Sequence, residues 1–317
     1  MKVFAGAIMM TLATATLSPA QATPADEAAV KTIVESVAIL ADTRNFEALE
    51  ALYADEVMVD YSSLSGEPAE LRSPPALMNE WAATLPGFDR TRHALSDVEA
   101  SVSGDSATAR ADVVAGHWID GAYWEVEGHY DYALIRGDEG WRITEMTFTL
   151  EDETGSRDVF GPAMEAAAAT PPSYVTRQRT RQAVIDFLEG LEEKNMDRVN
   201  GVWAEDAVQD MPYNTEGTPS RVVGRDALIA LYSGWPENAE NANFTDSLVF
   251  YPMRDPQIVF VEYRGRVDIV PTGREYRQTY GGLFHVNEAG KITLFREYYD
   301  PRAFQYAFAI GETAETE

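Results

Sequence analysis

The chain repeats itself at an offset of 150 residues, and this repeat limits the architectures that it can form. Four segments keep their order of apolar, acidic and turn residues at that offset: 42–46 with 192–196, 53–57 with 203–207, 60–61 with 210–211, and 140–143 with 290–293. A repeat of domain length predicts two copies of one fold. We place the copies at 26–155 and 174–310, joined by a linker over 156–173 that is rich in proline and alanine.

Both copies place helical periodicity before strand periodicity. Apolar residues recur with helical spacing near the start of each copy, as in Val30, Val34 and Val37, and again in Val184, Phe187 and Leu191. The remainder of each copy alternates with a period of two and is interrupted by turn signals, for example at 103–105 and 287–290. This order predicts an α+β fold in each copy, with one strongly curved antiparallel sheet wrapped around N-terminal helices.

Residues 1–22 have the pattern of a secretory signal peptide. Lys2 precedes an apolar stretch over 3–17, and Ala20-Gln21-Ala22 has the small-residue form of a cleavage site. We therefore expect cleavage near Ala22 and a secreted or periplasmic product. The chain has no cysteine, which excludes disulfides and thiolate chemistry.

The net charge of −27 restricts the partners that the chain can bind. Such a surface repels nucleic acid and anionic membranes, so neither is expected as a partner. A small molecule of apolar to neutral character is accommodated more easily than an anion, and a cation is not opposed by the charge. The acidity also has the simpler effect of keeping an exported protein soluble.

The first copy contains most of the groups that can move protons near neutral pH. Asp42 ends the first helical segment beside its apolar stripe, and a carboxylate there needs a partner such as a histidine. Alternation along 106–118 places His117 on the apolar face. In the next strand His129 falls among Glu127 and Asp131, which predicts a solvated ring.

The order of elements resembles the NTF2-like (cystatin-like α+β) superfamily, which includes the SnoaL-like proteins. The resemblance rests on Tyr-Ala-Asp-Glu-Val-Met-Val-Asp-Tyr at 53–61, Gly-Arg-Asp-Ala-Leu at 224–228 and Arg-Glu-Tyr-Tyr-Asp-Pro at 296–301. It implies two tandem cone-shaped half-barrels, each with a pocket at its mouth. The superfamily includes dehydratases, isomerases, cyclases, hydrolases and binding modules, so the activity has to be argued from the pocket residues.

The first copy resembles scytalone dehydratase in particular. Four positions match its motifs with almost unchanged separations: Asp42, Tyr61, His93 and His117. The resemblance implies that His93 is the general acid/base, that Asp42 and His117 form an oriented pair, and that Tyr61 polarises a carbonyl oxygen. It implies no cofactor and no metal. An imidazole titrates near pH 6.5, so it can both accept and return a proton.

The substrate contacts implied by the same resemblance differ from those of that family. Ala41 stands where the family has a tyrosine, and Tyr132 and Leu134 replace its serine and asparagine. We expect the pocket of the first copy to be lined by four further residues: Trp118, Tyr130, Tyr132 and Leu134.

The second copy lacks the four residues that match scytalone dehydratase in the first. At the offset of 150, Asp42 becomes Glu192, Tyr61 becomes Met211, His117 becomes Val267, and His93 falls at or next to Asn243. Its own candidates are Asp210, Tyr213, His285 and Glu297. The last lies in a segment, 296–301, that resembles an ending found in SnoaL-like polyketide cyclases. The family resemblance also implies that the two domains pair as an intrachain pseudo-dimer.

Four interpretations of function remain open at this point. The first is an exported, cofactor-independent lyase or isomerase that acts on a small hydroxy-carbonyl compound in the first domain. The second is a binding module that holds an apolar small molecule, and the third is a scaffold whose cones are filled. A metal site is the fourth, because His129-Tyr130-Asp131 has the local form of an iron site and His285 would have to be the distant ligand.

Overall fold

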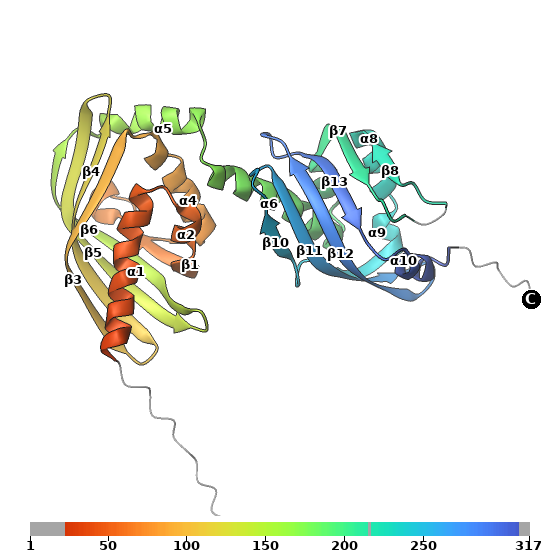
Figure 1. The fold of residues 1–317 in the computed structure, drawn as a ribbon, viewed down its shortest axis with the longest axis horizontal. Coiled ribbons are helices and arrows are strands. Elements are labelled where there is room, and N and C mark those ends of the chain that lie inside the picture. Colours follow the sequence, from red (N-terminus) through yellow and green to blue (C-terminus); the bar gives the residue numbers. More distant parts are fainter. Residues whose placement is uncertain (1–22, 215–216, 311–317) are drawn as a thin grey trace, which may run out of the picture. The chain divides into compact units, whose positions relative to one another are not determined.

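The computed structural model describes residues 23–214 and 217–310, and the segment expected to be a signal peptide lies outside this range. The chain divides into two compact units between Ala166 and Ala167 (Figure 1). Each unit contains one curved sheet and a set of helices, which confirms the predicted pair of α+β domains.

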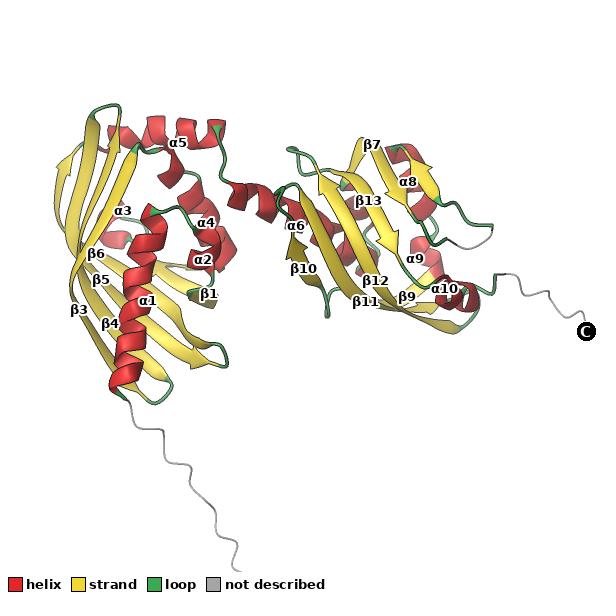
Figure 2. Ribbon diagram, in the orientation of Figure 1, coloured by secondary structure: helices red, strands yellow, loops and turns green. Residues whose placement is uncertain are grey.

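The first unit places its helices on one side of a six-stranded sheet (Figure 2). Its helices are α1 (Pro24–Asp42), α2 (Phe46–Glu50), α3 (Ser62–Ser65), α4 (Pro74–Ala82), the 3-10 turns η1 (Leu85–Gly87) and η2 (Arg157–Val159), and α5 (Phe160–Ala169), which extends just past the division. Its strands are β1 (Tyr53–Asp60), β2 (Glu70–Arg72), β3 (Arg90–Ser103), β4 (Ser106–Ile119), β5 (Ala122–Gly137) and β6 (Gly140–Gly155). The order is β2-β1-β6-β5-β4-β3, and every neighbouring pair is antiparallel except β1 and β6.

Helix α1 and strand β4 show why this unit closes around its core. Thr23 and Asp26 form a capping box at the start of α1, and the helix buries an apolar stripe that includes Val30 and Val34. The inward face of β4 is made mainly of small residues, among them Ala111 and Ala115. Small side chains leave room on the concave side of the sheet, where the helices pack.

The second unit repeats this topology. Its helices are α6 (Ser173–Glu192), α7 (Met196–Gly201), α8 (Arg225–Tyr232), α9 (Trp235–Asn238) and α10 (Pro301–Ala307). Its strands are β7 (Trp203–Asp210), β8 (Arg221–Val223), β9 (Ala239–Asn243), β10 (Val249–Pro252), β11 (Ile258–Ile269), β12 (Arg274–Val286) and β13 (Ile292–Tyr298). The order is β10-β11-β12-β13-β7-β8, with β9 also paired to β11 and with β7 and β13 parallel. Strands β9 and β10 together occupy the place that β3 has in the first unit.

The segment predicted as a linker is largely helical and contributes to the first core. Pro162 lies in the first turn of α5, where its missing N–H costs nothing, and the alanines that follow favour a helix. The Phe160 ring packs edge-on against Trp124 with centroids 4.9 Å apart, and Ala163 is fully buried. Composition suggested a spacer, but helix propensity and this packing make most of the segment part of the first unit.

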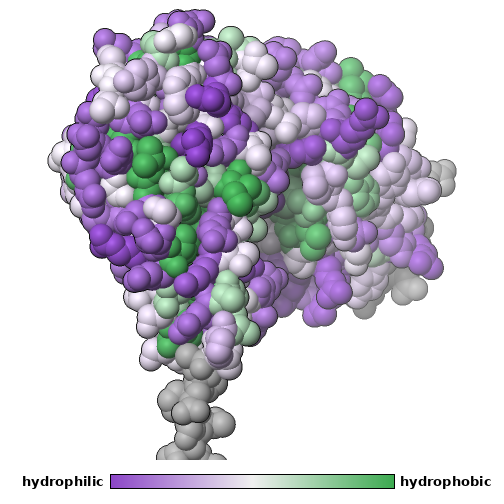
Figure 3. Space-filling model, turned by 60° about the vertical axis from the view of Figure 1, so that its left-hand side comes forward, coloured by the Kyte–Doolittle hydropathy of each residue, from purple (hydrophilic) through white to green (hydrophobic). Residues whose placement is uncertain are grey.

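The side of the first unit seen in Figure 3 is mainly hydrophilic, with apolar side chains gathered in a few small patches. This agrees with the strongly negative charge of the chain. No helix within 23–214 or 217–310 is long and apolar enough to cross a membrane.

We expect Gly87→Ala to destabilise the first unit by about 1–3 kcal/mol, because overpacking against a backbone atom cannot be relieved by a rotamer change. A Cβ at this position would lie 1.7 Å from the carbonyl oxygen of Ala163 in α5. Urea unfolding followed by circular dichroism measures the effect. Gly161→Ala is the matched control, since its Cβ would meet open space. Equal stability of the two variants would show that η1 and α5 are not packed together.

Candidate functional site

The carboxylate of Asp42 joins the end of α1 to strand β3. Its Oδ1 accepts hydrogen bonds from the Thr91 hydroxyl at 2.8 Å and lies 2.8 Å from Nδ1 of His93. Its Oδ2 accepts the backbone N–H of His93, also at 2.8 Å. The helix end, the strand and the imidazole are thus fixed by one carboxyl group.

Burial and hydrogen bonding act in opposite directions on Asp42. Partial burial opposes ionisation, but the hydrogen bonds from the His93 ring, the His93 backbone and Thr91 outweigh it and lower the pKa of Asp42 to about 2. The carboxylate is therefore ionised near neutral pH. It favours the tautomer of His93 that carries its proton on Nδ1, and this leaves Nε2 as a proton acceptor.

Arg44 supports the carboxylate from the turn after α1. Its guanidinium donates to the carbonyl oxygen of Asp42, to the Thr91 hydroxyl at 3.0 Å and to the carbonyl oxygen of Leu85 at 3.1 Å. Its backbone has a φ of 57°, in the left-handed region. Sequence analysis missed this residue. Its place two positions after Asp42, in a turn, was the only available signal.

The predicted pairing of Asp42 with His117 is wrong, because the carboxylate pairs with His93. Helix α1 packs on β3, the edge strand, whereas His117 lies one strand further in, on β4. In the register of the two strands Thr91 is opposite His117 and His93 is opposite Ala115, so all four side chains share one face. The two imidazole rings nevertheless meet, with centroids 5.4 Å apart and planes nearly perpendicular.

His117 is a buried imidazole that is held by aromatic rings. Phe88, Trp124 and Phe160 lie around it with ring centroids 5.0, 5.2 and 6.2 Å away. Burial and the neighbouring His93 lower the pKa of His117 to about 3, so the ring is neutral near pH 7. The buried Nδ1 has no hydrogen-bond partner among the described residues.

This environment favours one tautomer of His117. A buried acceptor without a partner costs less free energy than a buried N–H without one. The proton is therefore better placed on Nε2, and a neutral N–H can then donate to a bound molecule.

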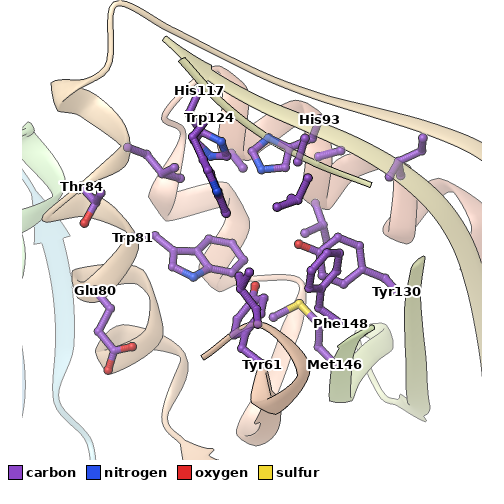
Figure 4. Close-up of a pocket in the computed structure, with 18 of the residues that line it drawn as sticks. Tyr61, Glu80, Trp81, Thr84, His93, His117, Trp124, Tyr130, Met146 and Phe148 are labelled. Atoms are coloured by element: carbon purple, nitrogen blue, oxygen red, sulfur yellow. The ribbon is translucent and has the colours of Figure 1, made fainter. Parts of the chain in front are cut away.

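His93 and His117 line one wall of a cavity of about 270 Å³ (Figure 4). Tyr61 and Tyr130 lie across it. Burial raises the pKa of both phenols above the ordinary value of 10, so both remain protonated. Each phenol therefore keeps an O–H that can donate to an oxygen in the cavity.

Two of the four expected pocket residues line this cavity, Tyr130 and Tyr132. Trp118 does not, because alternation along β4 turns it away from the face of His117, and Arg90 stacks on its ring at 3.9 Å. Leu134 faces inward but is buried in the core, with 1% of its surface exposed, and does not reach the cavity.

The cavity also contains aromatic and apolar residues that sequence analysis missed. Trp81 reaches it from α4, and Phe160 reaches it from the segment taken as a linker. Trp124, Met146 and Phe148 come from inward positions of β5 and β6. Strand alternation could have found these last three, since each lies two positions from a buried residue of the same strand and so faces the same side of the sheet.

His129 is less solvated than predicted. Its side chain is 12% exposed, and Nδ1 lies 2.8 Å from a carboxylate oxygen of Glu151, with Asp131 at 3.5 Å from Nε2. Carboxylates cover the ring because β5 and β6 place acidic residues side by side here. No group of three or more potential metal ligands occurs in the described ranges.

The four candidates of the second unit do not converge. Glu297 faces a cavity of about 320 Å³, whereas Asp210 is bound to Arg296 at 2.8 Å on the other side of the sheet. Tyr213 is 59% exposed, and His285 lies on the face of β12 opposite the buried residues. Strand alternation separates them, because Glu297 and Arg296 are neighbours and must point to opposite faces.

The fold and the cavity define a small α+β cone with an apolar, histidine-bearing pocket. A family model described as a SnoaL-like domain matches residues 22–147, and a second SnoaL-like domain model matches residues 184–295. The chain therefore belongs to the SnoaL-like (NTF2-like) family and carries two tandem copies of its domain.

Several relatives resemble one domain of this chain. The uncharacterized protein YesE of Bacillus subtilis (strain 168) is 30% identical over 131 residues, which cover 41% of this chain and 87% of that protein. A solved structure from Bacillus subtilis, described provisionally as an isomerase, is 27% identical with a TM-score of 0.40 and covers 42% of this chain and 95% of its own. Another, from Novosphingobium aromaticivorans and described provisionally as a scytalone dehydratase, is 19% identical with a TM-score of 0.37, over 41% and 87% of the two chains.

We expect Asp42 to make stability depend on pH in the acid range. Because its pKa is lowered from 3.8 to about 2 on folding, its ionisation stabilises the fold above pH 4. This contribution, about 2 kcal/mol, is lost as the pH falls through about 2. Urea unfolding at several pH values measures this effect. As the pH falls, the difference in free energy of unfolding between the unaltered chain and Asp42→Asn should decrease by that amount. Asp55→Asn, which removes an exposed carboxylate from the same domain, is the control. A difference in free energy of unfolding that does not change with pH would contradict the role given to the hydrogen bonds of Asp42.

Proposed function

We propose that the first domain is a cofactor-independent acid/base enzyme, a lyase or isomerase that removes a proton from carbon in a small hydroxy-carbonyl compound. The observation that carries the proposal is the contact of Asp42 with Nδ1 of His93, in a wall of a mainly apolar cavity. A carboxylate on the far nitrogen orients the ring and stabilises the imidazolium that forms when Nε2 takes the proton. Relatives described as isomerases and dehydratases agree with this class of chemistry.

The other polar groups of the cavity are suited to the oxygen of the substrate. As the α-carbon loses its proton to His93, charge moves to the carbonyl oxygen to form an enolate. The hydroxyls of Tyr61 and Tyr130 and the N–H of neutral His117 can donate to that oxygen. Burial raises the pKa of the phenols, so they keep their protons at neutral pH. It lowers the pKa of the imidazolium form of His117, so the ring is neutral and carries one N–H.

Two outcomes are open to the enolate, and both return the proton from His93. In a lyase the enolate expels a β-hydroxyl, which takes that proton and leaves as water. In an isomerase the proton is delivered to another carbon, and the double bond moves. The apolar lining excludes bulk water, which strengthens the hydrogen bonds to the developing charge.

We expect His93→Ala to lower proton abstraction by about 10²–10⁴-fold, the usual contribution of a positioned general base. The measurement is α-proton exchange of a panel of small β-hydroxy ketones in D₂O, followed by NMR. His129→Ala removes a histidine of the same domain from outside the cavity and should exchange at the unaltered rate. Normal exchange in His93→Ala would show that His93 is not the base, whereas no exchange above background in the unaltered chain would favour a binding module.

We expect Tyr61→Phe to lower kcat by about 10–100-fold with little change in KM, because a hydroxyl that stabilises the enolate acts mainly in the transition state. Steady-state kinetics on a substrate found in the exchange panel separates the two constants. Tyr123→Phe, at an exposed position of β5, is the control. An effect confined to KM would assign Tyr61 to substrate binding alone.

A further inference from the structure

The second unit has a cavity of its own, and half of its described lining residues are aromatic. Its volume is about 320 Å³, and the rings come from α6, α8, α9, β11, β12 and α10 and from the segments that follow β9, β13 and α10. Tyr263 and Tyr280 are stacked at 4.7 Å between centroids, and Tyr232 stacks on Trp203 at 6.2 Å. None of the described lining residues is a lysine, an arginine or a histidine.

Glu297 is the one acidic residue among those that line this cavity. Its Oε2 accepts a hydrogen bond from Nε2 of Gln209 at 3.1 Å, and Oε1 of Gln209 accepts from the Tyr232 hydroxyl at 2.8 Å. Oε1 of Glu297 accepts no hydrogen bond from any described residue. The amide chain orients the carboxyl group but does not neutralise its charge.

The groups that face Glu297 are all neutral. They are Gln209 on β7, Tyr232 on α8, Tyr263 on β11, Tyr276 and Tyr280 on β12, and Tyr299 just after β13. Burial raises the pKa of each of these phenols, so none carries charge near pH 7. Burial likewise raises the pKa of Glu297, to about 7, since its ionised form has no cation beside it.

We propose that this cavity binds an organic cation, an ammonium group with apolar substituents, whose charge pairs with the free oxygen of Glu297. Aromatic rings attract such a group through their faces as well as covering its substituents. An anion would meet the buried carboxylate with no basic residue to offset it. The negative charge of the whole chain also favours the approach of a cation. The proposal is independent of the chemistry assigned to the first domain.

Choline and 3,3-dimethylbutan-1-ol provide a direct test, because they have the same shape and differ in charge. Isothermal titration of the full chain at pH 8.5 should give at least ten-fold tighter binding of choline. Protons compete with the cation for Glu297, so choline should bind about 30-fold more weakly at pH 5.5. Equal binding of the two probes, no binding of either, or choline binding that does not change with pH would each overturn the proposal.

Glu297→Gln keeps the size of the side chain and removes its charge. Choline should then bind no more tightly than the alcohol, and its pH dependence should vanish. Glu262→Gln is the matched control, because it removes an exposed carboxylate from β11, outside the cavity, and should bind choline as the unaltered chain does. Choline binding that survives in Glu297→Gln would overturn the assignment. If that variant fails to fold by circular dichroism, the pH dependence in the unaltered chain decides.

Discussion

The carboxylate of Asp42 is the interaction on which the first site depends, because it fixes the end of α1 to the strand that carries His93. The second domain has the same interaction with a longer side chain. Glu192, at the end of α6, accepts hydrogen bonds from the backbone N–H groups of Phe244 and Thr245. No imidazole is present there, so a carboxylate at this helix end stabilises the fold whether or not chemistry follows. In the first domain the same carboxylate also orients the ring of His93.

The two domains share a framework and place their ionisable groups differently on it. In the first, the strand residue beside the carboxylate is His93, and the cavity contains imidazoles. In the second, the corresponding contact is made by Phe244, whose ring packs against Tyr263 and Tyr280. The acid of the second cavity comes instead from β13, two strands away from β11 in the sheet. The first cavity contains an imidazole base that is held by a carboxylate, whereas the second contains a carboxyl group with no base beside it. The two cavities therefore suit different ligands, although the topology of the domains and the size of the cavities are similar.

Much of the fold could be predicted from the sequence, and less of the site. Periodicity gave the helix stripe through Val30 and Val34 and the inward position of His117, because both follow from local geometry. It could not pair Asp42 with the right histidine, since alternation assigns a face of a strand but not the strand that lies under a helix end. Phe160 was missed for a related reason: only tertiary packing brings α5 to the cavity. The catalytic roles of Asp42, Tyr61, His93 and His117 stay predictions.

The buried Nδ1 of His117, which has no partner among the described residues, indicates that this histidine has a role beyond folding. Burying Nδ1 of His117 without a hydrogen bond costs free energy, and the fold does not require an imidazole at this place. Val267 occupies the corresponding position in β11, two residues before the strand ends, and it is fully buried. An apolar side chain therefore satisfies the packing of the same framework. No hydrogen bond within the described residues compensates the free-energy cost of burying Nδ1 of His117. A bound molecule that accepts a hydrogen bond from Nε2 would offset that cost.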